Sequence, residues 1–150
     1  MMVVARSLED KKLAADILLR EIGVQPCADM KAIFWVSDVT GKIEWLVGYT
    51  GFVGKVCQMH MVSFDTHWSP RPMLFACFDY PFNQLGLSSV LGIVNSTNEK
   101  ALRYDKHLGF KEVLRLPGCH DDGGDIVVMK MDRDECRWIK ERKNEARMVA

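Results

Sequence analysis

At 150 residues, 48% of them hydrophobic, the chain is long enough for one domain with its own core, and no linker or low-complexity segment divides it. Twenty basic residues balance twenty acidic ones, so the charge gives no reason to expect binding to nucleic acid or to an anionic membrane. No apolar run reaches the length of a membrane span, and the first residues lack the layout of a signal peptide.

Alternating apolar patterns in the first half of the chain predict strands at 2–5, 32–36, 43–49 and 56–64. Ser7 and Asp10 form a capping pattern in front of an amphipathic helix that ends at Gly23. Turns are predicted at 38–41 and at 51–55, where glycines interrupt the strand patterns. The first half is therefore expected to consist of strands with one helix.

Patterns in the second half predict a helix at about 72–85, a strand at 88–95, a helix at 98–108, a hairpin of strands 112–116 and 125–131, and a final helix with a charged, frayed tail at 140–147. Asn98 can cap its helix because its side-chain oxygen accepts from a free backbone N–H group. Gly109 suits the left-handed residue that ends a helix, and Phe110 begins the next strand. Asp132 and Glu135 are expected to open the final helix.

The unit of strand, asparagine-capped helix and glycine stop closely resembles the C-terminal half of the GNAT superfamily, the acyl-CoA-dependent N-acetyltransferases. The family's N-x-x-A and L-G-F patterns are matched by Asn98, Ala101, Leu108, Gly109 and Phe110. The resemblance covers about 73–131, and the segment 78–86 looks like the end of the family's central helix. It implies one α/β domain of the α+β type over 1–150: a mixed β-sheet, flanked by helices and splayed between its fourth and fifth strands, plus a C-terminal helix.

The function that this resemblance implies is transfer of an acetyl group from acetyl-CoA to a primary amine by direct attack. The co-substrate would lie in the splay, with its pantetheine arm beside Met59, Met61 and Val62 of the fourth strand and near Asn98. Alternation along that strand places Met59 and Met61 on the face opposite to His60. The other function considered is that of a GNAT-fold protein that has lost catalysis and binds a protein partner.

The resemblance extends to the small acetyltransferases that bacteriophages encode. The acceptor would be an amine on a small molecule or a protein, and a homodimer is compatible with this group. The five cysteines have no paired spacing, so they are expected to be reduced thiols in a cytoplasm, which is the host cytoplasm for a phage-encoded protein.

The segment before the central helix departs from the family. GNAT proteins have a Q/R-x-x-G-x-G/A stretch there, whose backbone N–H groups hold the CoA pyrophosphate. This chain has no glycine between 54 and 86, and the corresponding segment is 65–72. His67, Ser69 and Arg71 could compensate with side-chain contacts to phosphate. The alternative is that this loop has lost phosphate binding.

Many family members place a tyrosine seven residues after the asparagine, to protonate the departing CoA thiolate. That position is Asp105 here, and Tyr104 lies one residue earlier. One residue turns a helix by 100°, so the two side chains flank the apolar stripe on opposite sides and cannot share one catalytic place. We interpret Tyr104 as a packing residue. Asp105 is either a solvated helix carboxylate or a group that orients the substrate amine.

The attacking amine must lose a proton, so a base or a water chain is needed. His60 on the fourth strand is a suitable residue type, with Glu44 and Asp65 as alternatives and a structural role as the opposing interpretation. Trp68 could stack on the nucleotide or close a hydrophobic edge. The cluster 119–122 lies in a glycine-flanked turn, which predicts a polar loop and no metal site.

Overall fold

The computed structural model describes residues 1–64 and 69–140. Within them a seven-stranded sheet has the strand order β1-β2-β3-β4-β5-β7-β6. The strands are β1 (Met2–Val4), β2 (Lys31–Val36), β3 (Ile43–Val53), β4 (Val56–Ser63), β5 (Ser89–Asn95), β6 (Lys111–Leu116) and β7 (Ile126–Asp132). Only β4 and β5 pair in parallel, and the other neighbours in this sheet are antiparallel. The predicted mixed α/β sheet is confirmed.

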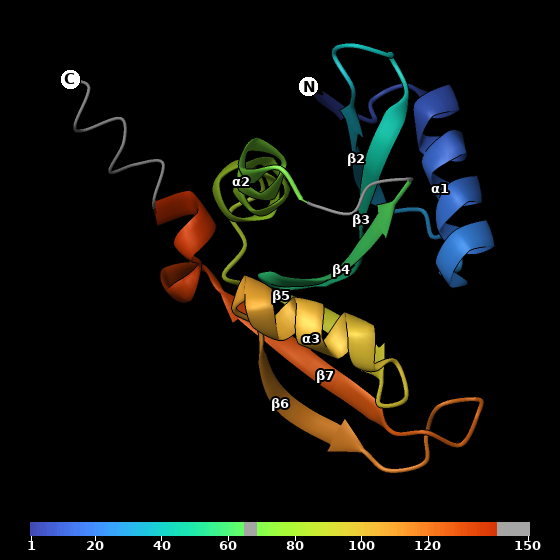
Figure 1. Cartoon of the computed structure of the whole chain (residues 1–150), viewed down its shortest axis with the longest axis vertical. Coiled ribbons are helices and arrows are strands. Elements are labelled where there is room, and N and C mark those ends of the chain that lie inside the picture. Colours follow the sequence, from blue (N-terminus) through green and yellow to red (C-terminus); the bar gives the residue numbers. More distant parts are fainter. Residues whose placement is uncertain (65–68, 141–150) are drawn as a thin grey trace.

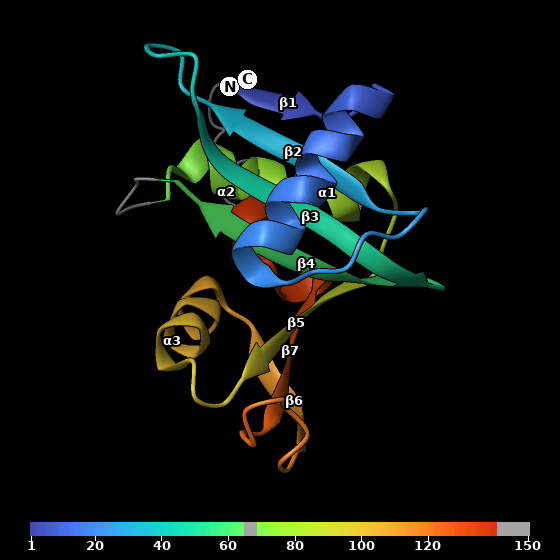
Figure 2. The ribbon, with the colours of Figure 1, turned by 90° about the vertical axis from the view of Figure 1, so that its right-hand side faces the viewer.

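Helices α1 (Leu8–Ile22), α2 (Arg71–Asp79) and α3 (Glu99–Leu108) pack on this sheet, and α2 continues into a π-helical turn, Tyr80–Gln84. Figure 1 and Figure 2 show α1 on one face of the β1–β4 half and α2 on the opposite face, with α3 beside β5 and β7. None of the helices within residues 1–64 and 69–140 is long and apolar enough to cross a membrane.

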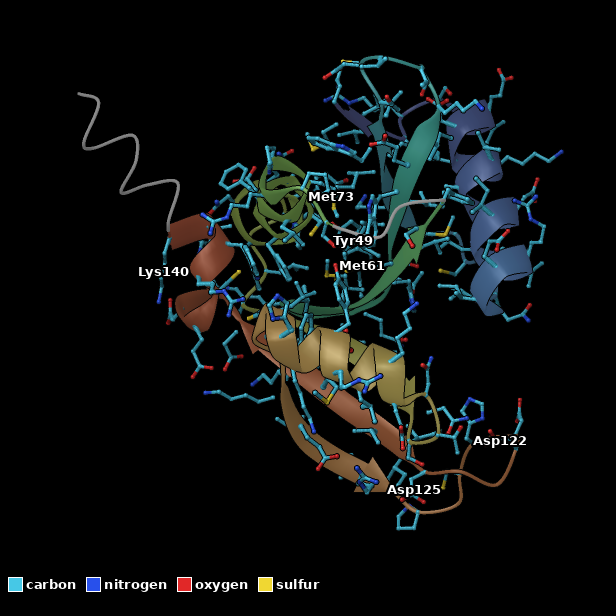
Figure 3. The ribbon with its side chains drawn as sticks, viewed as in Figure 1. Tyr49, Met61, Met73, Asp122, Asp125 and Lys140 are labelled. Carbon is cyan, nitrogen blue, oxygen red and sulfur yellow. The ribbon has the colours of Figure 1, made fainter. Side chains whose placement is uncertain are left out.

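Two hydrophobic cores lie on opposite faces of the sheet. The larger core lies under α2 and α3 and contains Tyr49, whose hydroxyl donates to the Cys77 carbonyl oxygen. Figure 3 shows Tyr49 and Met73 in the space between the sheet and α2. The smaller core lies under α1, where Leu18 packs so closely on Gly48 that a Cβ at Gly48 would lie 2.5 Å from the leucine Cδ1. The two cores therefore hold α1 and α2 against opposite faces of the same half of the sheet.

Strands β4 and β5 pair at one end and separate at the other. The paired residues are Val56 with Ser89, Cys57 with Val90, and Gln58 with Leu91. Beyond them β4 continues to Ser63 and β5 to Asn95 without pairing to each other. Figure 2 shows the two halves of the sheet diverging below β4. The predicted splay between the fourth and fifth strands is confirmed.

The turn predicted around Gly51 is wrong in part. Strand β3 passes through Gly51 and ends at Val53, so only two residues separate it from β4. The register of β3 against β4 shifts between Thr50 and Val53, and Gly51 has a φ of +59°. A glycine with positive φ inside a strand is typical of a bulge, which lets pairing continue past the irregularity.

The start of the final helix is also corrected. Asp132 is the last residue of β7, where its carboxylate accepts from the Ser89 hydroxyl at 2.6 Å. A 3-10 turn at Arg133–Glu135 follows, and the helix begins at residue 137. The side chain that resembled a helix cap is therefore used to join two strands. The predicted frayed tail lies, from residue 141 onward, outside the described residues.

The predicted limits of α3 are confirmed, and they give a stability test. Asn98 Oδ1 accepts from the Ala101 N–H at 3.2 Å, and Gly109 has a φ of +113°. Asn98→Ala is expected to lower the free energy of unfolding by about 1 kcal/mol in urea titrations. Gly109→Val should cost more, because a β-branched residue resists a positive φ. Arg103→Ala, on the exposed side of α3, is the control, and an Asn98→Ala protein as stable as the parent would contradict the capping argument.

Candidate active site

A cavity of about 760 Å³ occupies the gap where β4 and β5 have separated. Side chains alternate across the sheet, so Met59 and Met61 face the α2 side whereas Gln58 and His60 face the α1 side. All of these residues line the cavity. The cavity therefore reaches both faces of the sheet through the splay, which is unusual for the interior of a paired sheet.

The edge of β4 presents backbone groups to this gap. On the side of β4 that faces β3, the Phe64 N–H donates to the Glu44 carbonyl oxygen at 2.9 Å. On the side that faces β5, the Lys55 carbonyl oxygen accepts from the Ser88 N–H at 2.8 Å. Backbone groups alternate in direction along a strand, so even-numbered residues of β4 point to β3 and odd-numbered residues point toward β5. Met61 thus directs its N–H and C=O into the space from which β5 has diverged.

The predicted cofactor contacts on β4 separate into two kinds. Met59 and Met61 line the cavity, as predicted. Val62 does not line it: its side chain is 6% exposed in the core under α1, and its even number directs its backbone toward β3. Of the three predicted cofactor contacts on β4, the structure therefore leaves Met59 and Met61 as residues that can contact a ligand in the gap.

Asp105 lies on the α3 wall of the cavity, opposite Gly92 of β5. Its Oδ2 would lie only 3.0 Å from a Cβ at Gly92, so the absent side chain makes room for the carboxyl group. Burial raises the pKa of this carboxyl from 3.8 to about 6. Within residues 1–64 and 69–140 no donor bonds to the carboxylate to offset that burial. Asp105 therefore changes charge near pH 6.

Tyr104 lines the same cavity beside a different strand. Its ring stacks on Trp45 of β3, with the centroids 6.3 Å apart and the planes at 19°, and its hydroxyl lies 2.6 Å from Ser69 Oγ. Burial is the main cause that raises the pKa of this hydroxyl to about 12. The sequence predicted that Tyr104 and Asp105 could not share one place. Both contribute to the wall because the 100° step aims Tyr104 at β3 and Asp105 at β5.

His60 lies on the α1 wall of the cavity. Its Nε2 lies 2.7 Å from the hydroxyl of Thr50, which is itself buried. Burial lowers the pKa of the imidazole from 6.5 to about 4, so His60 is neutral at pH 7 and can accept a proton. Of the two alternatives, Glu44 does not line the cavity, and Asp65 lies outside the described residues.

The residues predicted to hold phosphate are dispersed. Ser69 and Asn98 line the cavity. Arg71 is exposed at the first turn of α2 and lies outside the cavity wall. His67, like Trp68, lies outside the described residues. Helix α2 begins after Pro70 with no side-chain cap. The sequence has no glycine between 54 and 86, so the expected glycine cradle is missing in front of this helix.

Sequence reasoning missed Trp45 and His120, which also line the cavity. Trp45 is 7% exposed, and its Nε1 has no hydrogen-bond partner among the described residues. His120 belongs to the cluster predicted to be a polar loop, and its Nδ1 lies 3.1 Å from Asn95 Nδ2. The alternating pattern of β3 indicated that Trp45 is a strand residue, but no sequence signal indicated that it faces α3.

Solved structures of spermidine N-acetyltransferase SpeG from Vibrio cholerae share this architecture. A mutant form gives a TM-score of 0.71 at 14% identity, with 95% of this chain and 97% of that chain covered. A chimera with hSSAT gives 0.70 at 15% identity, with 89% and 97% covered. The complex with CoA and spermine gives 0.68 at 13% identity, with 89% and 96% covered.

Comparisons with protein-family models and with curated proteins give no match. At these identities the likeness to solved structures shows the fold. The chain has the GNAT fold, with its splay between β4 and β5.

Proposed function

We propose that this chain transfers an acetyl group from acetyl-CoA to a primary amine. The observation that supports this most is the cavity in the β4–β5 splay, which has a carboxyl group on one face and a neutral histidine on the other. The SpeG structure in complex with CoA and spermine supports the same class of reaction. Fold alone does not determine activity, so the proposal depends on Asp105 and His60.

The backbone and side-chain groups that face the cavity are of the kind that would bind the pantetheine arm of acetyl-CoA, which carries amide groups. Met61 offers a backbone N–H and C=O that do not pair with β5 in the described part of the chain, and a peptide-like arm can pair there as an added strand does. Trp45 Nε1 is a buried donor without a partner in the described part of the chain, and buried donors are normally satisfied. An amide-bearing ligand in the gap would supply acceptors for such groups.

In the proposed reaction, the amine nitrogen attacks the thioester carbonyl, so that a C–N bond forms and the C–S bond breaks. His60, which is neutral at pH 7, accepts the proton that the amine loses. A backbone N–H of β4 stabilises the oxyanion of the tetrahedral intermediate. Asp105, at the position where the family has its tyrosine, has two candidate roles: its carboxylate orients the amine, or its protonated form donates a proton to the departing thiolate. The products are the acetamide and the CoA thiol.

Calorimetric titration of the parent protein with acetyl-CoA is the first test, because it needs no knowledge of the acceptor. The proposal expects saturable binding and release of the CoA thiol when an amine is present. The alternative of a non-catalytic GNAT-fold protein gains no support from the structural neighbours. It would be favoured if millimolar acetyl-CoA gave no binding, and that result would overturn the proposed activity.

Arg71→Ala is expected to weaken CoA binding by roughly ten- to hundredfold, the usual effect of losing a charge-assisted hydrogen bond. Arg71 is the cation at the first turn of α2, where the glycine cradle is missing. The same titration checks the result, and added salt should weaken parent binding because exposed charges are screened. Arg20→Ala, an exposed arginine on α1, is the control. If the parent binds tightly and Arg71→Ala binds equally well, phosphate compensation by Arg71 is wrong although the enzyme proposal stands.

A further inference from the structure

The α1 side of the cavity contains no acidic side chain among the described residues. Its lining there consists of Ile22, Val24, Gln58, His60 and Ile93, and His120 also lines the cavity. Asp105 is the carboxyl group in the described lining, and it lies on the opposite face beside Gly92. Lys100 adds a positive charge to the same cavity. A wall of this composition does not suit an acceptor with several positive charges.

The His120 ring is held in one tautomer by Asn95. Asn95 Oδ1 accepts from the Thr97 N–H at 3.1 Å, which fixes the orientation of the amide. Its Nδ2 therefore faces His120 Nδ1 at 3.1 Å and Asp122 Oδ2 at 2.7 Å. An amide nitrogen only donates, so His120 Nδ1 accepts and the proton of the neutral ring is on Nε2. The nitrogen left for a ligand is thus a hydrogen-bond donor.

Asp122, the carboxylate nearest to His120, accepts hydrogen bonds at both of its oxygens and keeps its negative charge. Its Oδ1 accepts from the Gly124 N–H at 2.8 Å, and its Oδ2 accepts from Asn95 and from the Thr97 hydroxyl at 3.2 Å. These donors, Gly124 first, hold the pKa of Asp122 below its usual range. His120 Nδ1 lies 3.3 Å from Oδ1, a longer contact to an oxygen already bonded. Figure 3 shows Asp122 in the loop between β6 and β7.

The loop that holds His120 is packed closely on β5. The His120 backbone N–H donates to the Gly124 carbonyl oxygen at 3.0 Å, and the Gly123 N–H donates to the His120 carbonyl oxygen at 2.9 Å. A Cβ at Gly124 would overlap Asn95 Oδ1, so only glycine allows this approach. The position of His120 in the cavity lining is therefore set by the backbone and by Asn95 together.

We propose that His120 selects acceptor amines that carry a carboxylate at their other end, through a hydrogen bond from Nε2 to that carboxylate. This inference rests on the proposed acetyl transfer and names its acceptor class. Lys100 assists by its charge, and the α1 wall of the cavity accommodates the carbon chain between the two ends. Diamines and polyamines, whose second end is positive, are poor acceptors for the same reason.

The test compares acceptors that differ only at the far end: 4-aminobutyrate, n-butylamine and 1,4-diaminobutane, together with their three- and five-carbon homologues. We expect kcat/KM to be about tenfold or more higher for the amino acid than for the alkylamine of the best length, and lowest for the diamine. His120→Ala should remove the preference for the carboxylate. His120→Gln should keep part of it, because its amide offers an N–H in place of Nε2–H.

His107→Ala is the matched control, since His107 lies in the last turn of α3 and does not line the cavity. Titration with acetyl-CoA accompanies every variant. Three results with a parent that binds acetyl-CoA would overturn the selectivity proposal only. These are a preference for the diamine, equal activity on the three acceptors, and acetylation of none of them. A preference for the amino acid that survives in His120→Ala overturns the role of His120. A parent that binds no acetyl-CoA overturns the proposed function and this inference together.

Discussion

Asp105→Asn is expected to stabilise the folded protein at pH 7 while lowering the rate of acetyl transfer by at least about a hundredfold. Burial raises the pKa of the folded Asp105 carboxyl to about 6, against 3.8 for an ordinary aspartate. Above pH 6 the folded protein therefore keeps an ionised carboxylate where burial opposes it. The difference between these two pKa values corresponds to a loss of roughly 3 kcal/mol in the free energy of unfolding at pH 7. The neutral asparagine side chain would avoid part of this loss.

The sign of the pH dependence follows from which state binds the proton more tightly. Below pH 4 both the folded and the unfolded Asp105 are protonated, so parent and variant should differ little. Between pH 4 and 6 the unfolded state ionises first, and the parent loses stability relative to the variant. Urea unfolding at several pH values measures this, with Asp16→Asn on the exposed side of α1 as the control. A stability difference that is the same at pH 4 and pH 7 would contradict the buried, uncompensated carboxylate.

The activity of the same variant distinguishes two roles for Asp105. A general acid works in its protonated form, so the part of kcat that depends on Asp105 should fall as the pH rises above 6. A carboxylate that orients a cationic amine works in its ionised form, and that part of kcat should then fall below pH 6. The ratio of parent to Asp105→Asn kcat across the pH range cancels ionisations that the two proteins share.

His60→Gln is expected to lower kcat by about 100- to 10,000-fold, the usual contribution of a positioned base. It should also make the protein more resistant to acid. Burial lowers the pKa of the folded His60 to about 4 from 6.5, so the unfolded state binds the proton first as the pH falls. The parent therefore loses up to roughly 3 kcal/mol of stability between pH 6.5 and 4, and the glutamine variant does not lose this part.

Urea unfolding at pH 4.5 and 7.5, with kcat at saturating acetyl-CoA, measures both effects. Thr50→Val keeps the imidazole and removes the hydroxyl 2.7 Å from Nε2, so it should lower kcat less than His60→Gln does. His107→Gln, outside the cavity, should change neither quantity. A His60→Gln protein with parental kcat would remove His60 from the mechanism, whatever its acid stability.

Local chemistry made part of this fold predictable. Asn98 and Gly109 mark the two ends of α3 because capping and a positive φ depend on single residues. The splay was predicted from a resemblance, since periodicity alone does not indicate where two strands stop pairing. Gly51 was taken for a turn because a glycine has the same backbone freedom in a turn and in a bulge.

The candidate site was less predictable, because its residues meet through tertiary contacts. Trp45 and Tyr104 are far apart in the sequence, and only the packing of α3 across the splay stacks their rings. His120 and Asn95 meet because the β6–β7 loop folds back on β5, which no periodic pattern encodes. Val62 illustrates the opposite error: one step along β4 moves a side chain to the other face of the sheet.

The short parallel contact between β4 and β5 also has a consequence for how the chain folds. Strands β2, β3 and β4 are joined in order by short connections, and β6 and β7 by a single loop, so each half of the sheet can form from nearby segments. Joining the halves instead requires closure of the loop from Gln58 to Leu91, which is entropically costly. Few residue pairs form between β4 and β5 to offset that entropic cost, because the two strands separate immediately afterwards. The same opening that leaves room for a ligand thus reduces the number of long-range pairs, the kind that slows folding.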